Sequence, residues 1–370
     1  MRRDRFSRPD GYIRASSGRR SDPQADSSPH AGGSDQGDGD RAGDANLARR
    51  RLAQGERGCD DGRRGSSRYS GRIVNGCTAI VPAYGSAATI GRTLLDLRRA
   101  SGGAVRRIIA VCSDRASAAA ARAVEGVEVI ESPARLSGGR ARNIGRRTAG
   151  AVDLLLFVDA DCRLDCDAPA RLIAELEISG VDAVAARLAS DGVDAVSWVR
   201  HLLEFKDYEL PVRRPLSWMT PSAVLLCRAE VFDRAGGFPD MWPGEDLVFC
   251  HRIARRGGRV ALSASVLARH CHPPGWRTLL RHQWRLGKTS AAARRLTGMK
   301  GEWFASRPWF APCLGTARLV RSLLWVMRRR PADIRRMTLL WAPLVAALGL
   351  WTLGFARGTL ERRAPVESRP

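Results

Sequence analysis

The chain is poor in lysine and in aromatic residues, and its cysteines do not have zinc-binding spacing. Among its 370 residues lysine occurs only at Lys206, Lys288 and Lys300, so arginine carries almost all of the formal net charge of +23. The nine cysteines form no pair of CxxC motifs and are interpreted as reduced thiols. Aromatic residues do not interleave with the arginines as an RNA-stacking surface requires. We therefore expect no nucleic-acid partner, and the charge fits an anionic membrane or substrate diphosphates.

The first part of the chain has hardly any bulky apolar residues. Residues 1–72 are mainly Arg, Asp, Ser and Gly with scattered prolines, a composition that cannot offset the entropy lost on folding. This segment also lacks the apolar core of a secretory signal peptide. The sequence therefore predicts a disordered tail over residues 1–72.

Strand and helix patterns alternate from Ile73 onward. Apolar runs at 77–81, 107–111, 127–130 and 154–158 predict strands, and helical patterns lie between them, including one over 140–149. Such alternation is typical of an α/β fold with a mostly parallel sheet flanked by helices. Further strands are expected at 181–188 and 223–227, with less regular sequence over 198–218 and a helix beginning at Gly244.

The most informative motif is the run Leu154–Val158 followed by Asp159 and Asp161. An apolar strand without polar alternation is typical of a strand covered on both faces. In open α/β sheets the carboxyl ends of the strands border the ligand crevice. Two carboxylates at that edge are suited to a phosphorylated ligand and a hard cation, although acidic Asx-turns after a strand are also common.

The C-terminal third has a different composition. Residues 276–336 combine arginines with tryptophans and leucines, which predicts basic amphipathic helices at a membrane interface. Residues 337–356 carry no charge over roughly twenty residues, enough to cross a hydrocarbon core of about 30 Å. A transmembrane helix is therefore predicted there, followed by a tail over 357–370. A buried hairpin helix is the alternative.

Five short motifs together resemble the inverting family 2 glycosyltransferases with the GT-A fold, from about Ile73 to Gly287. Each is weak alone, but their order and spacing agree with the family. They are Ile80-Val81-Pro82-Ala83-Tyr84, Ala141-Arg142-Asn143-Ile144-Gly145, Val158-Asp159-Ala160-Asp161, Gly236-Gly237-Phe238 and Glu245-Asp246. The resemblance implies a GT-A domain over 73–275, a nucleotide-sugar donor, a divalent cation (Mn²⁺ or Mg²⁺) and transfer with inversion.

The resemblance also implies roles for the acidic residues. Asp161 would hold the metal, and Asp159 would bind the ribose or the metal. Asp246 would be the catalytic base that takes the proton from the acceptor hydroxyl, with Glu245 as its neighbour or substitute. His270 and His272 follow a strand near this site and are further candidate metal ligands, although a lone histidine is usually structural.

The remaining resemblance-based candidates bind the donor. Pro82 and Tyr84 would line the nucleotide pocket, Asp114 would accept from the nucleobase, and Arg142 and Asn143 would approach the diphosphate. The sequence departs from the family after the second strand, where it reads Cys112-Ser113-Asp114-Arg115-Ala116. This departure leaves the identity of the base open.

The pattern favours a membrane-tethered glycosyltransferase at the cytosolic face of the cytoplasmic membrane, acting on a glycan or lipid-linked acceptor. One alternative is a nucleotidyltransferase, which normally has a basic, Gly-rich loop after its first strand, whereas Pro82–Gly91 contains no lysine or arginine. Another is a non-catalytic protein that binds anionic lipid or nucleic acid. The presence of both Asp159 and Asp161, and of Glu245-Asp246, argues against such a degenerate scaffold.

Overall fold

The computed structural model describes residues 76–210, 219–298 and 301–361. The tail expected over 1–72 and the chain after residue 361 lie outside the described residues.

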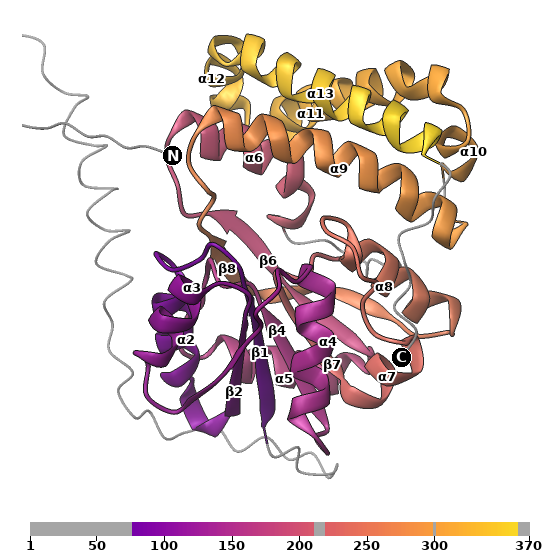
Figure 1. The fold of residues 1–370 in the computed structure, drawn as a ribbon. Helices are drawn as coiled ribbons and strands as arrows, with labels where there is room; N and C mark the ends of the chain where they lie inside the picture. The colour runs from indigo at the N-terminus through magenta and orange to yellow at the C-terminus, as the bar shows by residue number, and fades with distance from the viewer. Residues whose placement is uncertain (1–75, 211–218, 299–300, 362–370) are drawn as a thin grey trace, which may run out of the picture. The chain divides into compact units, whose positions relative to one another are not determined.

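Within the described chain, an eight-stranded sheet forms the centre of the fold, in the spatial order β3-β2-β1-β4-β7-β6-β8-β5 (Figure 1). The strands are β1 Cys77–Ala83, β2 Val105–Cys112, β3 Val127–Glu131, β4 Leu154–Val158, β5 Cys162–Arg163, β6 Ala183–Ser190, β7 Val224–Arg228 and β8 Val260–His270. Strands β3, β2, β1 and β4 are parallel, and so are β6 and β8. Strand β7 is antiparallel to β4 and β6, and β5 is antiparallel to β8. The predicted α/β class is confirmed, and the parallel half of the sheet carries the acidic motif.

Helices cover both faces of this sheet, which explains why β4 is apolar at every position. One face is packed by α2 Ile90–Arg98, α3 Arg115–Arg122 and α5 Ala168–Ser179, and the other by α4 Gly138–Ala149, α7 Ala229–Ala235 and α8 Glu245–Arg255. Figure 1 shows α2 and α3 on one side of the sheet and α4 and α7 on the other. Leu154, Leu156 and Val158 point into the first layer, while Leu155 and Phe157 point into the second. Each such side chain stabilises the fold by about 1.5–3 kcal/mol.

The parallel pairing sets the position of the polar residues. Because β1 lies between β2 and β4, the carboxyl ends of these three strands meet at one edge of the sheet. Tyr84, Ser113 and Asp159 follow those ends directly. The edge where the sequence predicts a ligand site is therefore formed by adjacent strands.

Helices also form a layer beyond this edge. They are α6 Ala195–Glu204, α9 Trp276–Thr297, α10 Glu302–Ala305, α11 Ala311–Arg329, α12 Ile334–Leu339 and α13 Trp341–Leu360. Short 3-10 turns lie at Ser101–Gly103, at η2 (Lys206–Tyr208), at Pro308–Phe310 and at Pro331–Asp333. An apolar cluster joins Val199 and Leu203 of α6 to Leu279 of α9, Val326 of α11 and Leu344 of α13. Helix α6 lies where the sequence suggested irregular structure, and Asp194 caps it by accepting from the N–H groups of Val196 and Ser197.

Helices α9 and α13 pack closely along their length, as the parallel ribbons in Figure 1 show. A Cβ atom on Gly287 of α9 would lie 2.0 Å from the Trp351 carbonyl oxygen, and one on Gly354 of α13 would lie 2.1 Å from the Trp284 carbonyl oxygen. Only glycine permits this backbone approach at both positions. One face of α13 is therefore packed against α9.

The expected transmembrane segment over 337–356 differs in its boundaries from the helices observed. The chain turns at Leu340, between α12 and α13, and α13 continues to Leu360 into the expected tail. Within the described residues α13 is the one helix long and apolar enough to cross a membrane, and 39% of its apolar window is buried in the protein. Its length fits the predicted span, and its packing fits the hairpin alternative.

Candidate active site

A cavity of about 1300 Å³ lies between the strand ends and the helices beyond them. It is lined by nine of the residues predicted from the sequence: Pro82, Tyr84, Arg142, Asp159, Asp161, Glu245, Asp246, His270 and His272. Asp114 and Asn143 are not among its lining residues. The fold therefore gathers most of the predicted site in one place.

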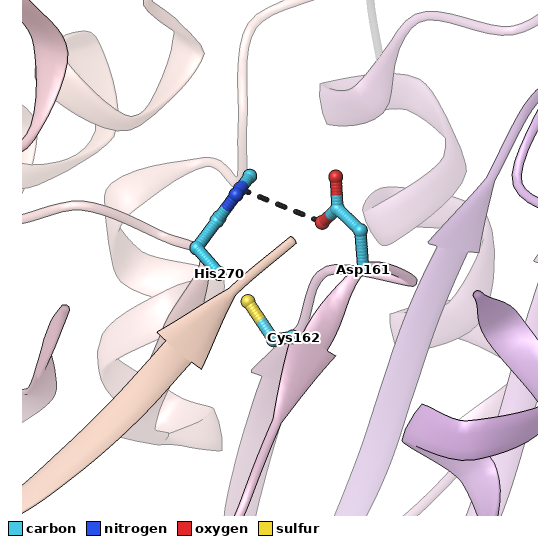
Figure 2. A group of neighbouring side chains, drawn as sticks. All are labelled: Asp161, Cys162 and His270. Atoms are coloured by element: carbon cyan, nitrogen blue, oxygen red, sulfur yellow. Dashed lines mark ion pairs between the residues drawn. The ribbon is translucent and has the colours of Figure 1, made fainter. Parts of the chain in front are cut away.

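Backbone pairing brings Asp161 and His270 together. The short strand β5 follows Asp161 and pairs with the end of β8, so that Cys162 lies opposite His270. The Cys271 N–H also donates to the Asp161 carbonyl at 2.8 Å. As a result His270 Nε2 lies 3.5 Å from Asp161 Oδ1, and Figure 2 shows the two side chains facing each other beside Cys162.

These three side chains form a group that could hold a metal ion, with their ligand atoms within 4.8 Å of one another. The Cys162 sulfur is a soft ligand on a fully buried side chain, and it suits a hard cation poorly. A carboxylate oxygen and an imidazole nitrogen remain. This donor set suits Mn²⁺ or Mg²⁺ better than a soft metal.

The electrostatics around Asp161 agree with a cation site. Burial raises the pKa of this carboxyl group, the neighbouring His270 lowers it, and the charge of Asp159 raises it again. A divalent cation would favour the ionised form of Asp161 and would balance the two adjacent carboxylates. The residues present therefore fit the group that the resemblance implies.

Arg142 links the two acidic motifs. Its guanidinium group is only 3% exposed and bonds to Asp159 at 2.5 Å and to Glu245 at 2.8 Å. These contacts keep the pKa of Arg142 above its usual value despite its burial. Burial in turn raises the pKa of Glu245 to about 7, against the opposing effect of Arg142. Arg142, which is itself held by Glu245, therefore positions Asp159. Because Glu245 is engaged in this ion pair, it is not an independent proton acceptor.

Asp246 differs from its neighbour. It is half-buried, lines the cavity, and accepts a hydrogen bond from the Leu247 N–H at 2.8 Å. Burial raises its pKa above the ordinary aspartate value, while the Leu247 N–H and Arg142 lower it. A carboxylate with a raised pKa that stays accessible from the cavity is a better proton acceptor than an ion-paired one.

The predicted nucleotide-binding residues have different environments. Pro82 and the half-exposed Tyr84 line the cavity, and the Arg135 guanidinium lies 4.1 Å from the Tyr84 ring centroid. Asp114 instead caps α3 by accepting from Ser117 N–H at 2.8 Å, and it accepts from Gly85 N–H at 2.7 Å. Asn143 bonds to the N–H and the carbonyl of Phe238. These last two side chains are thus held in structural contacts.

His272 lies beside His270, with ring centroids 4.8 Å apart, but is not part of the Asp161 group. Burial lowers its pKa to about 2, and neither ring nitrogen has a hydrogen-bond partner within the described chain. Its neutral ring faces the cavity and can both donate to and accept from a hydroxyl group.

Sequence reasoning missed the cavity wall opposite the strand ends. Basic residues of α6, η2, α9 and α11 line it: Arg200, Lys206, Arg281, Arg285, Arg294, Arg318 and Arg321. The signal available in the sequence was the arginine-rich composition of the helices, which by itself says nothing about which residues face a cavity.

Comparisons with known proteins agree with this architecture. A mannosyltransferase from Pyrobaculum calidifontis, solved in complex with GDP-Man and Mn²⁺, superposes with a TM-score of 0.53 over 78% of this chain and 88% of that chain. The two are 17% identical, so this likeness shows the fold, which is of the GT-A type.

The sequence comparison points to the same kind of protein. Residues 78–236, less than half of the chain, match the model described as Glycosyl transferase family 2. The chain is 28% identical over 215 residues to the Pre-mycofactocin glycosyltransferase of Mycobacterium tuberculosis, from strains CDC 1551 / Oshkosh and ATCC 25618 / H37Rv. The match covers 55% of this chain and 44% of the relative, so the chain matches less than half the relative's length. These findings support sugar transfer over the nucleotidyltransferase and non-catalytic alternatives.

Proposed function

We propose that this protein transfers a sugar from a nucleoside-diphosphate sugar to an acceptor hydroxyl or phosphate, with inversion at the anomeric carbon. The reaction takes place at the cytosolic face of the cytoplasmic membrane, in lipid-linked or cell-surface glycan synthesis. The observation that carries the proposal is the convergence of the Asp161–His270 pair, the Arg142-linked Asp159 and the accessible Asp246 in one cavity of a chain that matches the family 2 model.

The strand-end half of the cavity binds the donor. Tyr84 and Pro82 contact the nucleoside, and Asp159, held by Arg142, accepts from the ribose. Asp161 and His270 would hold Mn²⁺ or Mg²⁺, of which Mn²⁺ is the ion in the similar mannosyltransferase structure. When bound, such a cation offsets the negative charge that develops on the leaving diphosphate.

Asp246 acts as the general base. It takes the proton from the acceptor hydroxyl while the acceptor oxygen attacks the anomeric carbon on the face opposite the diphosphate. The new carbon–oxygen bond forms as the bond to the diphosphate breaks, which inverts the anomeric configuration. Glu245 is a positioning residue in this scheme, because it holds Arg142 and through it Asp159.

Membrane association rests on the distribution of exposed apolar side chains. Eleven of the seventeen large ones in the described chain lie after residue 300, although that part is the shorter one. They include Trp309, Leu339 and Leu353, each more than half exposed, and arginines surround them. Such a surface suits the headgroup region of a membrane. We propose that α11 to α13 lie against the membrane, with one face of α13 packed on α9.

An Asp246→Asn variant tests the assignment of the base. We expect donor binding with Mn²⁺ to persist in calorimetry while release of nucleoside diphosphate falls about a hundredfold or more. Asp233→Asn is the matched control, because Asp233 is half-exposed on α7, lies outside the cavity and pairs with Arg146. Full turnover in Asp246→Asn, with turnover abolished in Glu245→Gln, would reverse the two roles.

A further inference from the structure

The cavity has opposite charge at its two ends. Its strand-end half carries Asp159, Asp161, Glu245 and Asp246, whereas the opposite wall carries seven cations from α6, η2, α9 and α11. Two carboxylates, Glu204 and Asp207, also line this cationic wall. Glu204 accepts from Gln283 Nε2 at 2.6 Å and lies 3.4 Å from His282, and Asp207 pairs with Arg321 at 2.9 Å. Both carboxylates are therefore engaged, and the cationic wall keeps an excess of positive charge.

Arg200 indicates where on the cationic wall an anion would bind. Its side chain is 4% exposed and lines the cavity, yet Nε and Nη2 are buried with no hydrogen-bond partner within the described chain. The charge of Arg200 interacts electrostatically with Asp161 and Glu204, yet these two nitrogens have no acceptor, and an anion entering the cavity would supply one. This observation points to a ligand independently of the overall charge.

A second hollow of about 890 Å³ runs along the outer face of α11. Its lining residues recur at helical spacing: Pro312, Cys313, Thr316, Ala317, Val320, Arg321, Leu324, Trp325, Arg328 and Arg329. Most of its surface is apolar, and Val320 and Leu324 are 47% and 39% exposed. Ala317 and Arg321 also line the catalytic cavity, so the apolar hollow and the cationic wall adjoin on one helix.

We propose that α11 binds a phosphate-bearing membrane lipid and that this lipid is the acceptor. Its hydrocarbon chain lies in the hollow between Cys313 and Arg329, and its phosphate lies on the cationic wall at Arg321, Arg318 and Arg200. The inference rests on the proposed function and names its acceptor class. In that function the donor's diphosphate lies at the Asp161–His270 end, which leaves the cationic wall for a second anion. The apolar hollow beside it lies on a surface rich in exposed tryptophan and arginine. We therefore infer that the second anion is the phosphate headgroup of a lipid.

The thiol of Cys313 gives a direct readout of the hollow. It is exposed and lines the hollow, whereas Cys77, Cys112, Cys162, Cys227 and Cys250 are buried. We would incubate the full chain with phosphatidylcholine vesicles containing hexadecyl phosphate and follow maleimide alkylation of Cys313 by peptide mass spectrometry. The same vesicles with hexadecanol, and inorganic phosphate without vesicles, provide the comparisons.

We expect hexadecyl phosphate to slow alkylation of Cys313 and hexadecanol or inorganic phosphate to leave it nearly unchanged. Arg321→Gln should raise the hexadecyl phosphate concentration needed for protection about tenfold, the usual effect of losing a charged hydrogen bond. Arg335→Gln is the matched control, because it removes the same charge from exposed α12 and lines neither cavity. A second variant, Leu324→Asn, should weaken protection while donor binding is unchanged.

Three outcomes would overturn the inference. Equal protection of Cys313 by hexadecanol would show that the phosphate is not recognised. An equal effect of Arg321→Gln and Arg335→Gln would show that only general charge attraction is involved. The absence of any protection would show that no lipid binds in the hollow. Donor binding with Mn²⁺, measured calorimetrically on the same protein, separates the two proposals. If donor binding is retained while Cys313 is not protected, the lipid inference fails alone; if donor binding is absent, the proposed function fails.

Discussion

Replacing Arg142 by glutamine should strongly destabilise the protein. The guanidinium group bonds to Asp159 at 2.5 Å and to Glu245 at 2.8 Å, and Glu245 is only 5% exposed. Removing one partner of a buried ion pair typically costs on the order of 3–5 kcal/mol, because the other charge stays buried and unpaired. For a chain of this size we expect the thermal midpoint to fall by roughly 10 °C.

The loss of stability caused by Arg142→Gln should also depend on pH. Burial already raises the pKa of Glu245 to about 7, and Arg142 is the largest influence that opposes this rise. Without Arg142 the folded-state pKa rises further, while an unfolded glutamate titrates at about 4.3. At pH values between these two pKa values, Glu245 binds a proton in the folded protein but not in the unfolded chain. The stability of the folded protein therefore falls as the pH increases through this range. Arg142→Gln should therefore destabilise more at about pH 8.5 than at about pH 6.

Thermal unfolding of the detergent-solubilised full chain at both pH values is the assay. Arg146→Gln is the matched control on the same helix, because its partner Asp233 is 52% exposed, and exposed pairs contribute about 1 kcal/mol or less. The double variant Arg142→Gln/Glu245→Gln should recover much of the loss. An unchanged midpoint in Arg142→Gln at the higher pH, or no recovery in the double variant, would refute the reasoning.

Three further predictions concern other parts of the chain. Asp114→Ala should cost about 1 kcal/mol, the usual loss for a helix N-cap, and should leave donor affinity in calorimetry unchanged; a large loss of affinity would restore its nucleobase role. Gly287→Ala should lower the thermal midpoint, since its Cβ would meet the Trp351 carbonyl oxygen, whereas Gly349→Ala in open space should not. Membrane fractions washed with alkaline carbonate should release the protein if α13 packs on α9 at the surface, and retention would show that α13 crosses the bilayer.

The place of Asp159 and Asp161 in the fold could be predicted from the sequence. Leu154–Val158 has no polar position, and a strand of this kind is covered on both faces, so Asp159 and Asp161 had to lie at its exposed carboxyl end. The local spacing also contained signals that were overlooked. Asp114 and Ser117 have the spacing of a helix cap, and Asp194 before Val196 and Val199 marks the start of α6.

Tertiary contacts account for what the sequence could not show. Arg142 and Glu245 are 103 positions apart, and their ion pair depends on how α4 and α8 pack against the sheet. The cationic wall likewise combines Arg200, Lys206 and Arg318 from three separate elements. Hydropathy alone could not show that α13 packs on α9, because that packing depends on the close approach of Gly287 and Gly354 to the opposite backbone.

Calorimetric titration of a panel of nucleotide sugars, with and without Mn²⁺, tests the central claim most directly. The account predicts that one nucleotide sugar binds the full chain tightly only when Mn²⁺ is present. Asp161→Asn should abolish this metal-dependent binding in a folded protein, because an amide keeps the shape of the carboxylate but not the charge that holds a hard cation. Equal affinity with and without Mn²⁺, or unchanged affinity in Asp161→Asn, would contradict the account.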